Sequence, residues 1–285
     1  MNNISTTSQA LAKNPTSRPA NFTRHTTDLV AKFKQNHQWH LIPLYHLLRL
    51  SEFGREGIER SGSYKFADHL YRNEPAGQGI MGKWLDRVLL NLPAARGMRQ
   101  RCVEAERTLE ERLDATPNQL RVLALPCGIP RDVTRLLHRR PELTVRLNYV
   151  GMDMDEEVLG AAAEHLQEIR KLHPCLIQGD ALVSETYPEG TFDLIISTGL
   201  GEFLHDEALR VFYKNVFDHL NPGGMFYTSA TTKDEKSDFL LRSFELNTNY
   251  RDLAKTRLML APMAWSAVHL NADRTGLQTF VRAIK

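Results

Sequence analysis

The first candidate ligand-binding segment is a turn that begins with Pro126, Cys127 and Gly128. Gly128 can adopt a positive φ or let the backbone approach a ligand closely. The turn has a single glycine, and Pro126 and Pro130 each remove an N–H donor that a pyrophosphate would need. A ligand with an amino-acid tail and no phosphate needs fewer donors, so the turn favours such a ligand over a dinucleotide.

Carboxylates and small residues recur at three later points of the chain. Asp153 follows the glycine of the first turn by 25 residues, a spacing at which a carboxylate can accept hydrogen bonds from both hydroxyls of a ribose. The alternative is a helix cap, and we assign the ribose to Asp153 and the cap to Asp155. In Gly179-Asp180-Ala181 the carboxylate suits the exocyclic amine of adenine, or it stabilises a turn. The glycine in Ser197-Thr198-Gly199-Leu200 lets the backbone run close beneath a ligand, or it only marks a loop.

Four further side chains are candidates for catalysis or for binding an acceptor. His205 has a pKa range that suits a general base near neutrality, or it only begins a helix. Glu202 is a second candidate base, and it could instead hold a substrate amine. Tyr64 and Tyr71 lie in a glycine-flanked segment, where aromatic rings with polar tips suit a closing wall or pack two helices together.

Cys127 precedes a predicted helix, where a thiol could be a nucleophile, but no histidine is spaced as its partner. The 3 cysteines form no CxxC pair, and the 11 histidines show no HxxxH pair joined to a third ligand. We therefore predict no metal site and no disulfide framework.

Strands and helices must bring these turns together. From residue 120 onward, strand patterns alternate with helix patterns. This alternation predicts an α/β fold with a doubly wound, mostly parallel, seven-stranded sheet of the Rossmann-like kind, closed by an antiparallel C-terminal hairpin. Ligands bind such sheets beyond the carboxyl ends of the strands, which is where the turns fall. The predicted strands are 121–125, 147–153, 175–180, 192–198, 225–230, 265–270 and 277–285, and the predicted helices are 130–140, 155–172, 205–220 and 237–260.

The N-terminal part reads as helices at 28–58 and 83–113, joined by a connector at 61–82 and broken at Leu92-Pro93. The basic series Arg96, Arg99, Arg101 and Arg107 reads as a solvated helix face rather than a nucleic-acid groove. We predict three parts: a flexible tail at 1–27, a helical lid or substrate cap at 28–117, and a ligand-binding domain at 118–285.

The composition fits a soluble globular protein, with 42% hydrophobic and 25% charged residues. A formal net charge of +2 gives no reason to expect a nucleic-acid partner. No apolar run is long enough to span a bilayer, and few, scattered cysteines favour a reducing cytoplasm. The oligomeric state is not indicated.

From Leu120 to Gly224 the chain resembles a class I S-adenosylmethionine-dependent methyltransferase. The resemblance is carried by RVLALPCGIPRDV, YVGMDMDEEVL, IQGDAL, FDLIISTGLGEFLHDEALRVFYKNVFDHLNPGG and a closing hairpin that ends in TGLQTFVRAIK. It departs from the family in the first motif, where Ala124, Pro126 and Pro130 replace the usual acidic residue and glycines.

The resemblance implies S-adenosylmethionine as the cofactor. Cys127 and Gly128 would line its methionine part, with Pro126 beside them, and Asp153 would hold the ribose. The remaining implied contacts are Met154 beside the adenine, Gly179, Asp180 and Ala181 at the adenine edge, and Ser197, Thr198, Gly199 and Leu200 beneath the cofactor.

The function that this implies is methyl transfer to a small-molecule or lipid-like acceptor by in-line displacement under the N-terminal lid. Two alternatives stay open: a nicotinamide-dependent oxidoreductase, and a catalytically inactive cofactor-fold subunit that acts through interactions. A third possibility is methylation of RNA or protein.

Overall fold

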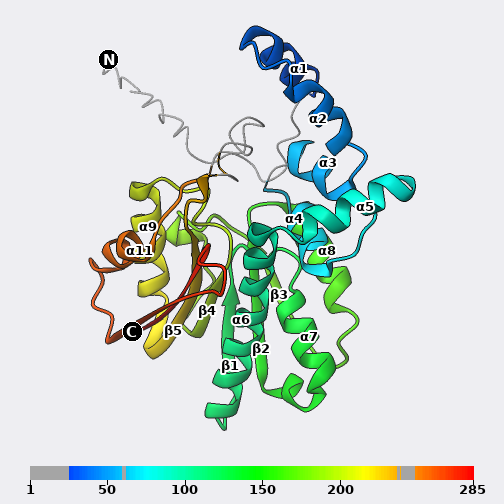
Figure 1. Cartoon of the computed structure of the whole chain (residues 1–285). Helices are drawn as coiled ribbons and strands as arrows, with labels where there is room; N and C mark the ends of the chain where they lie inside the picture. The colour runs from blue at the N-terminus through cyan, green and yellow to red at the C-terminus, as the bar shows by residue number, and fades with distance from the viewer. Residues whose placement is uncertain (1–25, 60–61, 236–237, 239–247) are drawn as a thin grey trace, which may run out of the picture.

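A seven-stranded sheet forms the centre of the computed structural model, which describes residues 26–59, 62–235, 238 and 248–285 (Figure 1). The strand order is β3-β2-β1-β4-β5-β7-β6. The strands are β1 (Leu120–Ala124), β2 (Leu147–Asp153), β3 (Cys175–Gln178), β4 (Phe192–Ser197), β5 (Leu220–Thr231), β6 (Ala267–Ala272) and β7 (Gln278–Ile284).

Strands β1 to β5 are parallel, and the antiparallel pairs β5–β7 and β6–β7 complete the sheet. The predicted fold class is confirmed, including the C-terminal hairpin at the edge. The strand order reverses between β1 and β4, so the turns after these two strands open on the crevice where ligands bind in such sheets.

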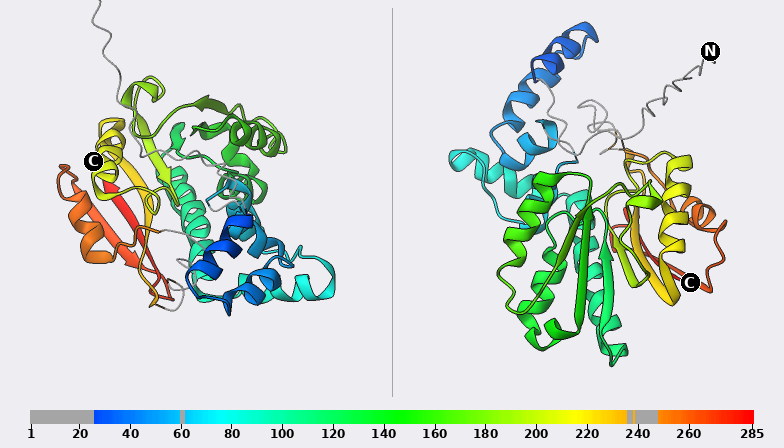
Figure 2. Two further views of the ribbon diagram at one scale, coloured as in Figure 1. Left: turned by 90° about the horizontal axis from the view of Figure 1, so that it is seen from above. Right: turned by 180° about the vertical axis from the view of Figure 1, so that it is seen from behind.

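Helices cover both faces of the sheet in three layers (Figures 1 and 2). One face packs against α6, α7 and α8 through a core that includes Leu109, Leu136 and Ala162. The other packs against α9 and α11 through a core that includes Phe212 and Met259. These helices are α6 (Pro93–Ala115), α7 (Arg131–Arg139), α8 (Glu156–Leu166), α9 (Asp206–Asp218) and α11 (Leu253–Leu260).

The helices α1 to α5 lie beyond the carboxyl edge of the sheet, and α1 and α2 extend away from the layered body (Figures 1 and 2). They have two small cores of their own, one around Phe33 and Tyr45 and one around Phe53 and Leu70. The helices are α1 (Thr26–Gln35), α2 (Leu41–Leu48), α3 (Glu52–Glu59), α4 (Tyr64–Arg72) and α5 (Gly79–Leu90). None of the helices in the described part of the chain is long and apolar enough to cross a membrane.

The predicted connector at 61–82 is wrong in one respect, because it contains α4 and the start of α5. Ser63 caps α4 by accepting a hydrogen bond from the Phe66 N–H (3.2 Å), and Asn73 ends it in the left-handed conformation (φ 56°). The helix predicted at 155–172 ends earlier, at Leu166. Much of the helix predicted at 237–260, and most of the tail predicted at 1–27, lie outside the described residues.

Candidate functional site

The first turn and the end of β2 meet at the edge of the sheet. The Cys127 N–H donates to the Met152 carbonyl (2.9 Å), and the Gly128 N–H points to Asp153 Oδ2 (3.3 Å). Gly128 has a positive φ of 51°, and a Cβ built there would meet no atom within 4 Å. The turn therefore leaves open space beside the Asp153 carboxylate.

Asp153 is buried, with 6% of its surface exposed. Burial raises the pKa of its carboxyl group, and the N–H groups of Asp155 and Gly128 oppose that rise. Among the described residues, no lysine or arginine is paired with it. A buried carboxylate held only by backbone N–H groups has acceptor capacity left for the hydroxyls of a ligand. Asp155 instead caps α8 by accepting from the Glu157 N–H (2.9 Å), which confirms the cap.

The turn after β3 lies beside this carboxylate. The Gly179 N–H donates to the Asp153 carbonyl (3.0 Å), and a side chain at Gly179 would collide with Met152. Met154 is exposed at the surface of the same edge. Asp180 Oδ1 accepts from the Leu182 N–H (2.8 Å), so the carboxylate does stabilise a turn, and this bond leaves its second oxygen for a ligand.

Ala181 is fixed by its carbonyl, which accepts from the Tyr187 hydroxyl (2.9 Å) and from the Asn215 side-chain amide (3.2 Å). Its position is thus set from two directions.

The segment after β4 forms the other wall of the crevice. Ser197 is 1% exposed, and its hydroxyl has no hydrogen-bond partner among the described residues. Gly199 has a φ of 88°, which an L-residue rarely adopts, and a Cβ there would lie 3.5 Å from the Arg101 guanidinium. Leu200 packs against the core around α9. The backbone at Gly199 therefore runs between the crevice and a buried cation.

That cation, Arg101 on α6, forms a buried ion pair with Glu202. Arg101 Nη1 lies 2.6 Å from Glu202 Oε1, and the two residues are 4% and 7% exposed. The Thr231 hydroxyl donates to the same oxygen (2.7 Å), and Gln278 donates to that hydroxyl (2.9 Å). Glu202 Oε2 is buried and has no partner among the described residues. A carboxylate with one occupied and one free oxygen can accept a hydrogen bond from a bound molecule.

Helix α4 lies close to both sides of the crevice and carries both candidate tyrosines. Near its start, the Tyr64 hydroxyl donates to Glu157 (2.8 Å) at the beginning of α8. Near its end, burial raises the pKa of Tyr71, while the charge of Arg101 and a hydrogen bond with Thr198 oppose the rise. Tyr71 therefore stays protonated at neutral pH, and its hydroxyl is a donor rather than a base.

The structure does not bring all candidates together. His205 is exposed at the start of α9, and its side chain makes no capping hydrogen bond. Burial raises the pKa of the Cys127 thiol well above its ordinary value, so a nucleophilic thiolate is disfavoured. No group of three or more potential metal-binding side chains occurs in the described part of the chain.

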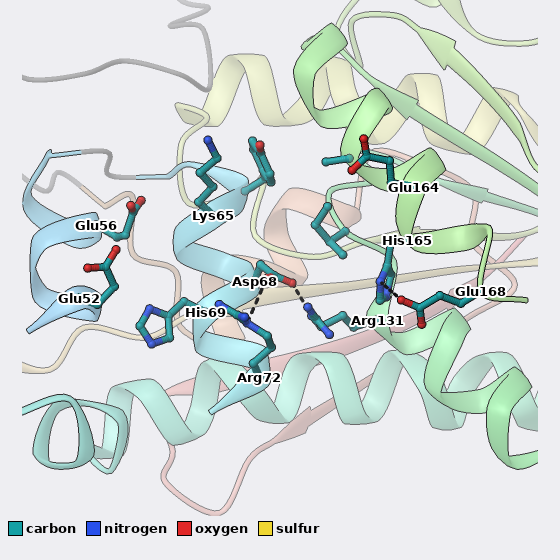
Figure 3. Close-up of a pocket in the computed structure, with 13 residues that line it drawn as sticks. Glu52, Glu56, Lys65, Asp68, His69, Arg72, Arg131, Glu164, His165 and Glu168 are labelled. Atoms are coloured by element: carbon teal, nitrogen blue, oxygen red, sulfur yellow. Dashed lines mark hydrogen bonds and ion pairs between the residues drawn. The ribbon is translucent and has the colours of Figure 1, made fainter. Parts of the chain in front are cut away.

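A polar cavity of about 500 Å³ lies between α3, α4, α8 and the start of α7 (Figure 3). Its charged side chains mostly neutralise one another: Asp68 pairs with Arg131 and with Arg72 (3.3 Å), and His165 lies 3.7 Å from Glu168. The Asp68–Arg131 pair connects α4 to the start of α7, and an ion pair between Lys65 and Glu157 (2.9 Å) connects it to the start of α8. We interpret the cavity as part of the contact that holds α4 over the sheet.

Several residues of this site escaped the sequence analysis. Arg101 was expected on a solvated face, which is wrong, because the segment after β4 and the end of β5 enclose it. Arg251, 3% exposed, holds that segment by donating to the carbonyls of Gly201 (2.7 Å) and Leu204 (2.6 Å). No local pattern marks these residues, since Glu202, Gly201 and Leu204 lie 101, 50 and 47 positions away from them.

A family model described as "Putative methyltransferase" matches residues 48–234, almost two thirds of the sequence. The chain belongs to this methyltransferase family. The chain has the sheet predicted for a class I methyltransferase. The family match begins before α3, so most of the N-terminal helices lie within the matched region. No curated protein sequence matches the chain.

Solved structures show the same fold. A possible exported protein from Bordetella parapertussis is 22% identical, with a TM-score of 0.76 over 96% of this chain and 99% of that one. Magnesium protoporphyrin IX methyltransferase from Synechocystis PCC 6803, with bound S-adenosylhomocysteine, is 16% identical, with a TM-score of 0.54 over 76% and 93%. The carbon methyltransferase CurJ is 14% identical, with a TM-score of 0.56 over 91% and 70%.

Proposed function

We propose that this methyltransferase binds S-adenosylmethionine and methylates a small-molecule or lipid-like acceptor by in-line displacement beneath its N-terminal helices. The observation that carries the proposal is the position of Gly199. Gly199 follows β4, the strand beside β1, and a Cβ at Gly199 would lie 3.5 Å from the guanidinium of Arg101, the partner of Glu202. In this proposal, the short segment around Gly199 separates the cofactor, bound beside Asp153 and Gly128, from the acceptor, bound beside the Arg101–Glu202 pair.

On the cofactor side, the residues fit a nucleoside with an amino-acid tail. Asp153 has buried acceptor oxygens for ribose hydroxyls, and open space surrounds Gly128. We assign the methionine part to Pro126, Cys127 and Gly128. We assign the adenine to Met154, Gly179, Asp180 and Ala181. The segment beneath the cofactor is Ser197, Thr198, Gly199 and Leu200. When bound, the cofactor supplies an electrophilic methyl group.

On the acceptor side, Glu202 and Tyr71 have complementary roles. The free Oε2 of Glu202 accepts from an N–H or O–H group of the acceptor and can take its proton. The protonated Tyr71 hydroxyl donates to a lone pair nearby. Arg101 holds the Glu202 carboxylate in place through the ion pair at 2.6 Å. A role for His205 requires an acceptor that reaches the start of α9.

Helix α4 acts as the lid in this proposal. Tyr64 contacts the ribose side through Glu157, and Tyr71 contacts the acceptor side through Thr198 and Arg101. Closure by these contacts would exclude water from the reacting groups, and the family match supports a shared role for the helices from residue 48 onward. We retain 1–27, 28–117 and 118–285 as tail, cap and cofactor-binding domain, although α6, at the end of the cap range, packs against the sheet.

We propose that the protein is located in the cytoplasm, on the basis of its cysteines. All three, Cys102, Cys127 and Cys175, are unpaired, as expected in a reducing environment. The similar Bordetella protein is described as possibly exported, so fractionation of cells would test the compartment directly.

Calorimetric titration with S-adenosylhomocysteine tests the cofactor site. Asp153→Ala should weaken binding by at least about 1.5 kcal/mol, because it removes charge-assisted hydrogen bonds. Asp155→Ala is the matched control: it removes the cap of α8, costs about 1 kcal/mol of folding stability, and should leave the dissociation constant unchanged.

Equal affinity of the Asp153→Ala and wild-type proteins would contradict the ribose assignment. Titration with NAD and NADP completes the test, since binding of either in place of S-adenosylhomocysteine would contradict the proposed cofactor.

A further inference from the structure

Helix α5 exposes an apolar ridge. Ile80, Trp84 and Val88 are spaced by four residues and therefore lie along one side of the helix, and they are 92%, 54% and 42% exposed. Met81, 54% exposed, lies beside them. Such a run of large apolar side chains in water is characteristic of a surface that contacts another phase or molecule.

The ridge is held rigidly because the opposite side of α5 is anchored. Asp86 is fully buried, and its carboxylate accepts from Ser51, from the Phe53 N–H (3.1 Å), and from the N–H groups of Ala76 and Gly77 (2.7 Å each). These bonds fix the rotation of the helix about its axis. The outward direction of the ridge is thus built into the fold.

The charges that flank the ridge are basic. Lys83 and Arg87 are exposed on α5 next to the apolar side chains, and Asp86, the single acidic residue of the helix, is the buried anchor. An apolar strip with a cationic border, containing a tryptophan, is the pattern of a helix that lies in the plane of a membrane interface.

We propose that α5 docks this methyltransferase on the surface of an anionic lipid bilayer. Ile80, Trp84 and Val88 enter the boundary between headgroups and acyl chains, and Lys83 and Arg87 contact lipid phosphates. The helix projects at the outer edge of the molecule (Figures 1 and 2). This inference rests on the exposed side chains and not on the proposed function.

A second copy of the chain is a poorer occupant. A two-fold contact through this ridge would bring the Lys83 and Arg87 side chains of both copies into one interface. Because the helix exposes no carboxylate, no acidic side chain of α5 could neutralise them. A lipid surface supplies the missing negative charge, which is why we favour it.

Sedimentation with vesicles tests the proposal on the full chain. We expect at least tenfold stronger partition into vesicles of phosphatidylcholine and phosphatidylglycerol in equal parts than into phosphatidylcholine alone. Ile80→Asp should lower partition at least tenfold. Leu258→Asp is the matched control, because Leu258 is a similarly exposed apolar side chain (66%) on α11, and it should have no effect. Lys83→Gln and Arg87→Gln should each lower partition about fivefold.

Other outcomes would overturn the proposal. Absence of vesicle binding by the wild-type protein, or equal loss in the Ile80→Asp and Leu258→Asp variants, would exclude docking through α5. Light scattering that shows a dimer dissociated by Ile80→Asp, without vesicle binding, would assign the ridge to a second copy instead. Thermal unfolding midpoints of the variants check that each one folds.

Discussion

The buried pair of Arg101 and Glu202 permits a sharp test of the site in the absence of any acceptor. Both residues are more than nine-tenths buried, so removing either one leaves the other charge without its counter-charge in a place that water hardly reaches. Such a loss costs about 3–5 kcal/mol. We therefore expect Arg101→Met and Glu202→Met each to lower the free energy of unfolding by that amount.

The double variant should lose far less free energy of unfolding than the two single variants lose when their losses are added. Methionine has nearly the volume of either side chain, and no buried charge remains. The residual cost comes mainly from the Thr231 hydroxyl, which loses its acceptor on Glu202, and is about 1–2 kcal/mol. The coupling between the two substitutions should therefore exceed about 3 kcal/mol.

Urea unfolding at constant ionic strength measures these values, provided that the dependence on denaturant concentration stays the same among the variants. A second ion pair on the same helix, Arg107–Glu111 (2.8 Å), provides the control. Arg107 is 64% exposed there, so Arg107→Met should cost no more than about 0.5 kcal/mol.

Additive costs for Arg101→Met and Glu202→Met would refute the reasoning, as would a cost of Arg101→Met no larger than that of Arg107→Met. Retained binding of S-adenosylhomocysteine in the double variant would further separate this pair from the cofactor edge.

Two other properties are open to direct measurement. Burial raises the pKa of Asp132 from its ordinary 3.8 to about 6, so ionisation opposes folding, and the stability present below pH 4 is lost as the pH rises through 6. Asp132→Asn should flatten this part of the pH–stability curve and stabilise the protein at pH 8 by up to about 3 kcal/mol, whereas an unchanged curve would contradict the shift. Iodoacetamide should modify the exposed Cys175 in the native protein before Cys102, whose pKa burial raises to about 12, and mass spectrometry that finds Cys102 modified first would contradict this order.

The sheet could be predicted because its strands are short apolar runs bounded by turn residues. Leu147–Asp153 was placed to the residue, and the hairpin was recognised from its Asp- and Gly-containing turn. The cofactor edge was predictable for the same reason. Gly128 lies in the turn after β1, Asp153 ends the parallel neighbour β2, and the Gly128 nitrogen lies 3.3 Å from Asp153 Oδ2.

What escaped prediction depends on contacts between distant segments. Helix α4 was hidden among glycines, although Ser63 at its start is a recognisable cap. Arg101 lies on a helix rich in charge, and its burial is decided by a loop 101 residues later. Glu202 was identified as a candidate, but its partner Arg101 was not. The periodicity of a helix does not indicate which of its sides a loop from a distant part of the sequence will cover.

Helix α6 limits how this enzyme can be recombined with its relatives. Its first turn belongs to the small core of the N-terminal helices through Ala95, and its later turns belong to the core of the sheet through Leu109 and Leu113. A chimaera that joined foreign N-terminal helices after residue 117 would replace the α6 side chains of that core, Ala105, Leu109 and Leu113. A crossover at Leu92-Pro93, where α5 has ended and α6 begins, would keep it intact. The segment from α1 to α5 can thus be exchanged as a unit, with α6 inherited together with the sheet that it packs against.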